Sequence, residues 1–160
     1  TELAYTIAHC GDYNYFSFKG MRSKGNNELH VTSTHYDDQI ALDLVRGSQR
    51  TVAIHGCEGN ESVAYIGGSD DRLIELITES LEDIGISVRE APHHISGTQE
   101  NNIVNMTQTQ GGVQLELTAQ LRKELFKNRK SSRKNRENKD NWGDLMYDFA
   151  DAMKKAIERA

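Results

Sequence analysis

One histidine and one glutamate stand out in this sequence, because each lies in or beside an apolar segment where polar side chains are uncommon. His55 ends the apolar run TVAI, and Glu116 lies between two leucines in VQLEL. A carboxylate in such surroundings is costly unless it has a partner or a task. Desolvation would raise the pKa of Glu116 toward the range of a general base. The alternative is that Glu116 faces solvent on an edge strand.

His55 also begins an H-x-x-E spacing that ends at Glu58. Histidine and glutamate are both zinc ligands, and catalytic zinc sites keep one coordination position open for water. A single H-x-x-E often arises by chance, so the spacing alone does not identify a metal site. The place of His55 at the end of a strand favours a functional imidazole, with a structural histidine as the alternative. We interpret Glu58 as an exposed loop acid.

Two polar segments supply further candidates for binding. LHVTSTHYDD contains His30 and His35, whose spacing places them on opposite faces of an extended chain, so they would not bind one metal together. His35 precedes a predicted helix and is the better site candidate, with a hydrogen-bonded loop histidine as the alternative. Asn102 and Asn105 lie in a polar loop, where their amides can contact a polar ligand or make ordinary turn contacts.

Predicted strands and helices alternate along the chain and must position these residues. The spacing of apolar residues predicts helices over 2–9, 38–45, 69–84, 119–126 and 142–157, and strands over 13–18, 29–34, 51–54, 62–66, 86–89 and 113–118. Asp37 or Asp38 can cap the second helix and Ser69 the third. The continuous apolar run 51–54 is typical of a strand that is buried on both faces.

This alternation predicts an α/β fold with a mainly parallel sheet. In such sheets ligands bind beyond the carboxyl ends of the strands, where His55 and Glu116 are both expected. A length of 160 residues fits one domain, 1–160, with a core of its own. The sequence has no apolar run of about 18 residues that could cross a membrane. Cys10 and Cys57 are too few for a disulfide framework, so we expect two thiols, with a single bridge as the alternative.

Positive charge is concentrated in residues 127–139, within a net charge of −5 for the whole chain. This segment has no apolar residue, so burial cannot offset the entropy of ordering it, and we expect a mobile surface loop. A basic run can bind a polyanion through counterion release, or it can be a solvated linker. It has no aromatic side chain to stack on bases, which argues against a nucleic-acid partner.

Longer motifs give the sequence a resemblance to a known family. GNNELHVTSTHYDD, VAIHGCEGNESVAYIGG, NNIVN and GGVQLELT occur in the order seen in phage and bacillar poly-γ-glutamate hydrolases. The resemblance covers essentially the whole chain, including TELAYTIA at its start. The family is similar to the zinc carboxypeptidases, which implies an open mixed sheet flanked by helices. Its members cut the γ-glutamyl amide bonds of the poly-γ-glutamate capsule.

The resemblance also implies roles for individual residues. His55 in VAIHG matches the third zinc ligand of the family, and Glu116 in VQLEL matches its catalytic glutamate. The first two ligands of the family lie in an H-x-G-G-I-E-type loop directly before a helix that begins T-x-E-L. Glu2 and Leu3 match that E-L, so the ligand loop is expected upstream of Thr1.

Substrate recognition is expected to differ from the family pattern in one respect. Met106 stands where the family usually carries arginine after N-I-x-N, so recognition of a substrate carboxylate is expected to shift to Arg22 or Lys24. The resemblance otherwise implies poly-γ-glutamate as the polymer that is bound, with His35, Asn102 and Asn105 as candidate contacts.

The resemblance as a whole implies a zinc-dependent γ-glutamyl hydrolase in which Glu116 activates a zinc-bound water. It further implies a monomeric bacterial or phage protein that acts on extracellular capsule after release. Three other functions stay open. They are a zinc deacylase of small acyl-amino acids, a metal-free module that binds the capsule polymer, and a nucleic-acid-binding protein that uses the basic run.

Overall fold

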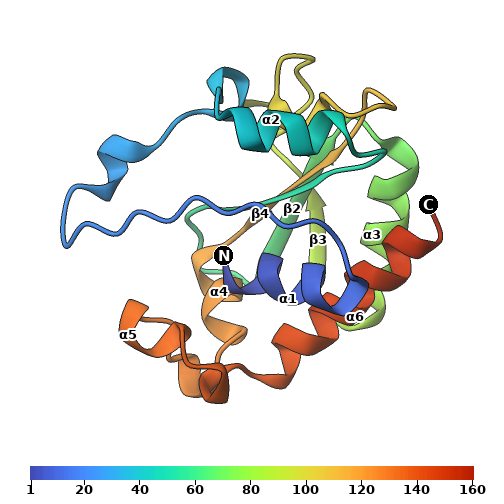
Figure 1. Ribbon diagram of the computed structural model, residues 1–160. Helices are drawn as coiled ribbons and strands as arrows, with labels where there is room; N and C mark the ends of the chain where they lie inside the picture. Colours follow the sequence, from blue (N-terminus) through green and yellow to red (C-terminus); the bar gives the residue numbers. More distant parts are fainter.

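The computed structural model describes all residues, 1–160, and has a four-stranded sheet at its centre (Figure 1). The strands are β1 (Val52–Gly56), β2 (Val63–Gly68), β3 (Ser87–Glu90) and β4 (Val113–Leu117). Their order in the sheet is β1-β4-β2-β3. The β1/β4 and β2/β3 pairs are parallel, and the antiparallel β2/β4 pair joins them. The expected α/β fold with an open, mixed and mainly parallel sheet is thereby confirmed.

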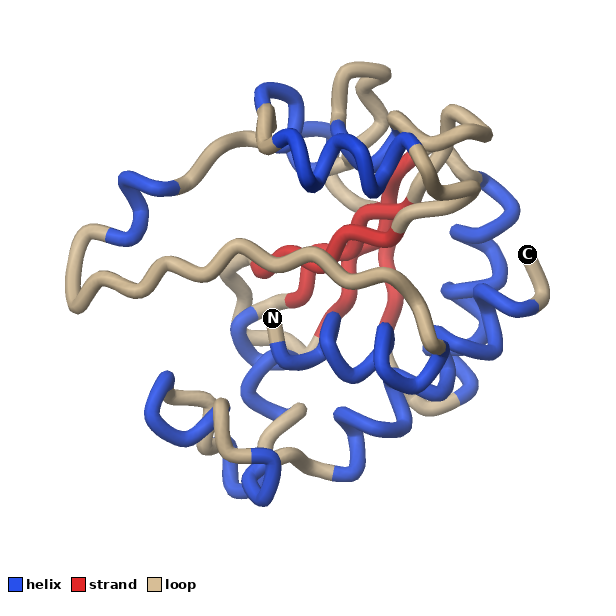
Figure 2. The backbone as a smooth tube through the Cα atoms, in the orientation of Figure 1, coloured by secondary structure: helices blue, strands red, loops and turns tan.

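Helices flank this sheet (Figure 2). They are α1 (Glu2–Gly11), α2 (Gln39–Arg46), α3 (Asp71–Asp83), α4 (Ala119–Glu124), α5 (Arg133–Arg136) and α6 (Asp144–Glu158). α1, α3 and α6 supply apolar side chains to one hydrophobic core together with β2 and β4. In Figure 1, α2 lies above the sheet, whereas α1 and α6 lie below it.

α3 illustrates how the sequence specifies a helix in this fold. Its apolar residues recur every three or four positions, and Leu73, Ile77 and Leu81 are fully buried. The N-cap is Asp70, whose side chain accepts a hydrogen bond from the backbone nitrogen of Leu73 at 3.0 Å. The expectation that Ser69 caps this helix was therefore wrong by one residue. At α2, Asp38 makes the corresponding contact with the backbone nitrogen of Ala41.

β4 lies between β1 and β2 and is buried along its whole length. Successive side chains of a strand point to opposite faces. Leu115 and Leu117 join the core with Phe149 and Met153 of α6, and Glu116 points to the other face. The alternative of a solvent-facing glutamate on an edge strand is therefore wrong.

The segments around β1 differ from the sequence-based expectations. β1 is an edge strand whose residues Val52 to His55 are only half-buried, because it pairs on one side alone, so burial on both faces was wrong. Residues 13–18 form no strand, and the 29–34 region contains 3₁₀ turns instead, namely η1 (Asn26–Leu29) and η2 (Ser33–His35). Aromatic residues favour strands only where a neighbouring strand is present to pair with them.

The basic segment 127–139 is more structured than a loop. It contains α5 and the 3₁₀ turns η5 (Lys127–Arg129) and η6 (Lys139–Asn141). Buried apolar residues on either side of it, Phe126 and Trp142, pair as an isolated β-bridge. The indole nitrogen of Trp142 also donates a hydrogen bond to the carbonyl of Arg136 at 2.7 Å. These flanking contacts order a segment that has no apolar residue of its own.

Two further expectations can be compared with the structure directly. Cys10 and Cys57 are both free thiols, as expected. None of the helices combines the length and the apolar character that crossing a membrane would require.

Candidate functional site

His55 and Glu116 lie side by side on neighbouring strands. β1 and β4 are parallel and pair His55 with Glu116, so the two side chains project from the same face of the sheet. The antiparallel pairing of β2 with β4 places Tyr65 next to Glu116, and Arg89 of β3 follows Tyr65. We call these four residues the cross-strand row. The first two were expected to meet at the sheet, whereas Tyr65 and Arg89 were missed because strand register is not visible in the sequence.

Glu116 is buried beside the polar side chain of Gln114, and it does not line the cleft described below. It is 7% exposed. Its Oε1 accepts a hydrogen bond from Nε2 of Gln114 at 3.3 Å, and the same Gln114 nitrogen donates to the carbonyl of Ile95. Burial raises the pKa of Glu116, while the Gln114 hydrogen bond and the charge of Arg122 oppose that rise. A carboxyl group with a raised pKa is suited to take a proton at neutral pH.

Asn102 and Asn105 are both buried, and their amide groups are hydrogen-bonded within the protein. Asn102 donates to Oε1 of Gln114 at 3.2 Å and accepts from the backbone nitrogen of Val104, which begins the 3₁₀ turn η4 (Ile103–Asn105). Nδ2 of Asn105 donates to the backbone carbonyls of Gly97 and Gln99. Neither asparagine lines the cleft described below. Their amides therefore fix the 93–107 loop, which contains η3 (His93–Ile95), and they also fix Gln114.

His55 keeps its imidazole neutral. Burial lowers the pKa of His55, and the nearby His30 lowers that pKa further. His30 and His55 line the same cleft, whereas His35 in η2 does not line it, although both His30 and His35 are exposed. His30 rather than His35 therefore shares the cleft with His55, and its spacing along the chain gave no sign of this.

A cleft of about 710 Å³ runs beside β1. Its walls come from α1, α2, the chain around residues 13–18 and the chain around residues 29–36, and most of them are apolar. His55 and His30 are among the few ionisable groups in it. A concave, mainly apolar cleft with a few polar groups is typical of ligand sites.

Arg122 of α4 fixes the ends of the two strands that carry the site. Its Nε donates to the carbonyl of Leu117 at 3.1 Å, and its Nη2 donates to the carbonyl of Cys57 at 3.0 Å. The backbone nitrogen of Cys57 also donates to the carbonyl of Leu117. These bonds tie the end of β1 to the end of β4, directly beyond His55 and Glu116.

Residues 1–160 fit only part of a zinc site. They contain no group of three or more His, Cys, Asp or Glu side chains that could hold a metal ion. His55 offers one neutral imidazole, the form that metals bind. Glu58 is exposed after β1. A catalytic zinc needs three protein ligands, so this set of residues does not complete one.

A neutral imidazole beside a buried carboxylate, near the ends of adjacent strands, is an arrangement that can support general acid–base chemistry. Comparison with known proteins gives the family. Residues 1–152 match the poly-gamma-glutamate hydrolase family, and the chain belongs to it. The resemblance seen in the sequence motifs is thereby confirmed.

Curated relatives come from Bacillus subtilis (strain 168). The SPbeta prophage-derived UPF0714 protein YoqZ is 35% identical over 128 residues, which are 79% of this chain and 46% of YoqZ. The UPF0714 protein YmaC is 31% identical over 155 residues, which are 92% of this chain and 62% of YmaC. The chain thus spans about half to three-fifths of the length of these relatives.

Solved structures share the fold. A bacteriophage poly-gamma-glutamate hydrolase matches with a TM-score of 0.93 and 31% identity, over 99% of this chain and 75% of that one. YndL, in a form described as apo and zinc-free, matches with a TM-score of 0.84 and 26% identity, over 98% of this chain and 76% of that one.

Proposed function

We propose that this chain carries the catalytic sheet of a zinc-dependent hydrolase that cleaves the γ-glutamyl amide bonds of poly-γ-glutamate. Membership of the poly-gamma-glutamate hydrolase family supports the reaction and the polymer. The observation that carries the assignment to residues is the register of β1 and β4, which pairs His55 with Glu116. The zinc-free description of YndL supports a metal requirement within this fold.

Glu116 acts as the general base in this proposal. Its buried carboxylate takes a proton from the water that attacks the scissile carbonyl, and passes a proton to the leaving amine. Gln114 holds one carboxylate oxygen, so the other is available for that transfer. Arg122 keeps the strand ends in register and thereby keeps Glu116 beside His55.

His55 is the proposed metal ligand of this chain. Because residues 1–160 hold no set of three ligands, the proposal requires ligands in addition to His55, from outside these residues. Of the substrate contacts expected from the sequence, His35 has an exposed side chain. Asn102 acts by holding Gln114 in place, and Asn105 acts by holding the 93–107 loop in place.

Two substitutions in the full-length protein test these roles. Glu116→Gln should lower kcat on poly-γ-glutamate by about 10²- to 10⁴-fold, the usual contribution of a general base, with the zinc content unchanged. His55→Ala should lower the zinc content measured by elemental analysis. Glu58→Gln is the control, because that acid is exposed, and it should alter neither quantity. Unchanged turnover in the Glu116 variant would remove this residue from the mechanism.

The same preparation separates the hydrolase from two of the other functions that the sequence left open, the deacylase and the binding module. A deacylase would cleave small acyl-amino acids in preference to the polymer. A non-catalytic module would bind the polymer and leave its length unchanged. Measuring product size and binding on one sample therefore discriminates the three.

A further inference from the structure

Two segments far apart in the chain hold most of its positive charge. Residues 19–24 and 127–139 contain ten of the nineteen lysines and arginines and one of the twenty-four acids. The rest of the chain holds nine basic and twenty-three acidic side chains. We call the two segments together the basic lobe.

The two segments form one surface. The guanidinium of Arg133 in α5 donates to the backbone carbonyl of Arg22 at 3.3 Å and to that of Met21 at 3.4 Å. Figure 1 shows α5 and the extended chain around residue 20 on the same side of the molecule. The charge of both segments therefore acts on the same region of solvent.

Much of this charge is free to meet a ligand. Lys19 and Lys24 of the first segment are exposed and make no ion pair, and the same is true of the second-segment lysines Lys127, Lys130 and Lys134. By contrast, Arg22 pairs with Glu28, and Arg136 pairs with Glu2. Unpaired surface cations attract anions more strongly than cations that are already neutralised by neighbours.

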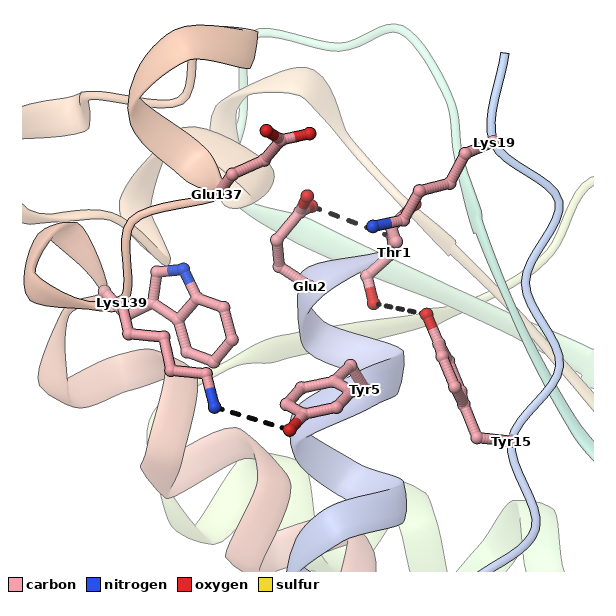
Figure 3. A pocket seen from close by; sticks show the side chains of 8 residues that line it. Thr1, Glu2, Tyr5, Tyr15, Lys19, Glu137 and Lys139 are labelled. Carbon is pink, nitrogen blue, oxygen red and sulfur yellow. Dashed lines mark hydrogen bonds and ion pairs between the residues drawn. The ribbon is translucent and has the colours of Figure 1, made fainter. Parts of the chain in front are cut away.

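A smaller pocket joins the basic lobe to the cleft that contains His55. This rim pocket has a volume of about 410 Å³, and its lining includes Thr1, Glu2, Tyr15, Lys19, Glu137 and Lys139 (Figure 3). Thr1 and Tyr15 also line the cleft. The rim pocket and the cleft are therefore adjacent, and the cations of the basic lobe that line the rim pocket lie next to the cleft.

The rim pocket offers both charge and apolar surface. Nζ of Lys139 lies 4.7 Å from the centre of the Tyr5 ring, and 5.5 Å from that of Trp142. Figure 3 shows the side chain of Lys19 directed toward Thr1. Two acids, Glu2 and Glu137, also line the pocket, and Glu2 is paired with Arg136. Lys19 and Lys139 can pair with carboxylates of a ligand, and the rings of Tyr5 and Trp142 offer apolar surface to its methylene groups.

We propose that the basic lobe and the rim pocket bind the part of the anionic polymer that lies beyond the bond being cleaved, an inference that rests on the proposed function. Poly-γ-glutamate carries one free carboxylate on each residue. The remainder of this molecule is strongly acidic and repels such a chain, so the lobe is the surface along which several carboxylates can lie. Long polymer should therefore bind better than short oligomers.

A double variant with one charge removed from each segment tests this surface in the full-length protein. Lys19→Gln with Lys134→Gln should raise KM for long poly-γ-glutamate by about 2- to 30-fold, because each exposed charge contact contributes about 1.4- to 5-fold. The rise should be smaller for a γ-glutamyl tripeptide, which cannot reach the lobe. Raising the ionic strength to about 0.5 M should reduce the difference between the variant and the unmutated protein.

Arg46→Gln with Lys155→Gln is the matched control, because both side chains are exposed, make no ion pair and lie on α2 and α6. It should leave both values of KM unchanged. Equal effects in the two double variants, or an equal rise for polymer and tripeptide, would overturn the inference. The inference would also be overturned if the Lys19/Lys134 variant lost binding of a DNA oligonucleotide while its KM for the polymer stayed unchanged.

Failure of the proposed function has a different signature. In that case the unmutated full-length protein cleaves no γ-glutamyl substrate. Titration with uncleaved polymer then decides the inference directly. Binding that weakens in the Lys19/Lys134 variant and not in the control supports the basic lobe, and equal binding in both refutes it.

Discussion

Burial of Glu116 has opposite consequences for the stability of the fold and for the proposed role of this residue as a general base. Burial disfavours its charged form and raises its pKa above the ordinary value of 4.5. In the unfolded chain this pKa returns to that ordinary value. The folded state therefore binds more protons than the unfolded state between the two values. As the pH rises through this window, the carboxylate ionises and the folded protein loses stability relative to the unfolded chain.

Replacing this carboxylate should therefore stabilise the protein at neutral pH. Glu116→Gln keeps the size and the hydrogen-bonding capacity of the side chain and removes its charge. We expect a higher melting temperature than that of the unmutated protein at pH 7, and a difference that shrinks as the pH approaches about 4.5. Thermal unfolding monitored by circular dichroism at several pH values measures this. A melting temperature at pH 7 that is equal to or below the unmutated value would contradict the account.

His55 and Glu116 could be predicted from the sequence because polar residues in strand-like apolar segments are conspicuous. Gln114 lies in the same strand, yet its bond to Glu116 depends on a loop that comes from residues 93–107. Tyr65 enters the cross-strand row through pairing between strands, and His30 reaches the cleft through a long irregular segment. Such contacts arise from tertiary structure, which single-sequence patterns do not contain.

At the scale of the elements, helix ends depend on single side chains. Asp70 caps α3, and Oδ2 of the same carboxylate lies 3.4 Å from Nε of Arg50. Asp70→Ala should lower the free energy of unfolding by about 0.5–2 kcal/mol through loss of the cap. Ser69→Ala should change it by less than about 0.5 kcal/mol. Denaturant unfolding measures both changes. Equal losses in the two variants would contradict the assignment of the cap to Asp70 rather than Ser69.

Asp70→Asn separates the two roles of this aspartate. Asparagine is as good an N-cap as aspartate, so a small effect of this variant would assign the stabilisation to the cap. An effect as large as that of Asp70→Ala would assign it to the contact with Arg50.

The four strands and every helix except α5 could be predicted because apolar periodicity reflects burial, which the sequence records directly. The prediction of a strand over residues 13–18 was wrong for a physical reason. The aromatic residues of this segment suit a strand, but no neighbouring strand pairs with them, and they line the cleft instead. The same cause explains β1, whose apolar run suggested burial on both faces although the strand has one partner.

For the whole molecule, the core and the cross-strand row occupy opposite faces of one sheet. Phe149 of α6 is completely buried among the helices below β4. Phe149→Ala should lower the free energy of unfolding by about 3–5 kcal/mol. The exposed residue Asp148 on the same helix is the control, and Asp148→Ala should change it by less than about 0.5 kcal/mol. Denaturant unfolding of both variants makes the comparison, and similar losses would contradict the assignment of the core.

The pairing of β1 with β4 has a consequence for how this site can evolve. The side chains of β4 alternate, so sliding it by one position would turn Leu115 and Leu117 to the face that now carries Glu116 and would place Glu116 among the apolar helices. A sheet whose register is shifted by one residue therefore cannot keep both the packed core and the pairing of His55 with Glu116. Selection for a well-packed core also maintains the alignment of these two residues, even in lineages where the proposed reaction is under no selection.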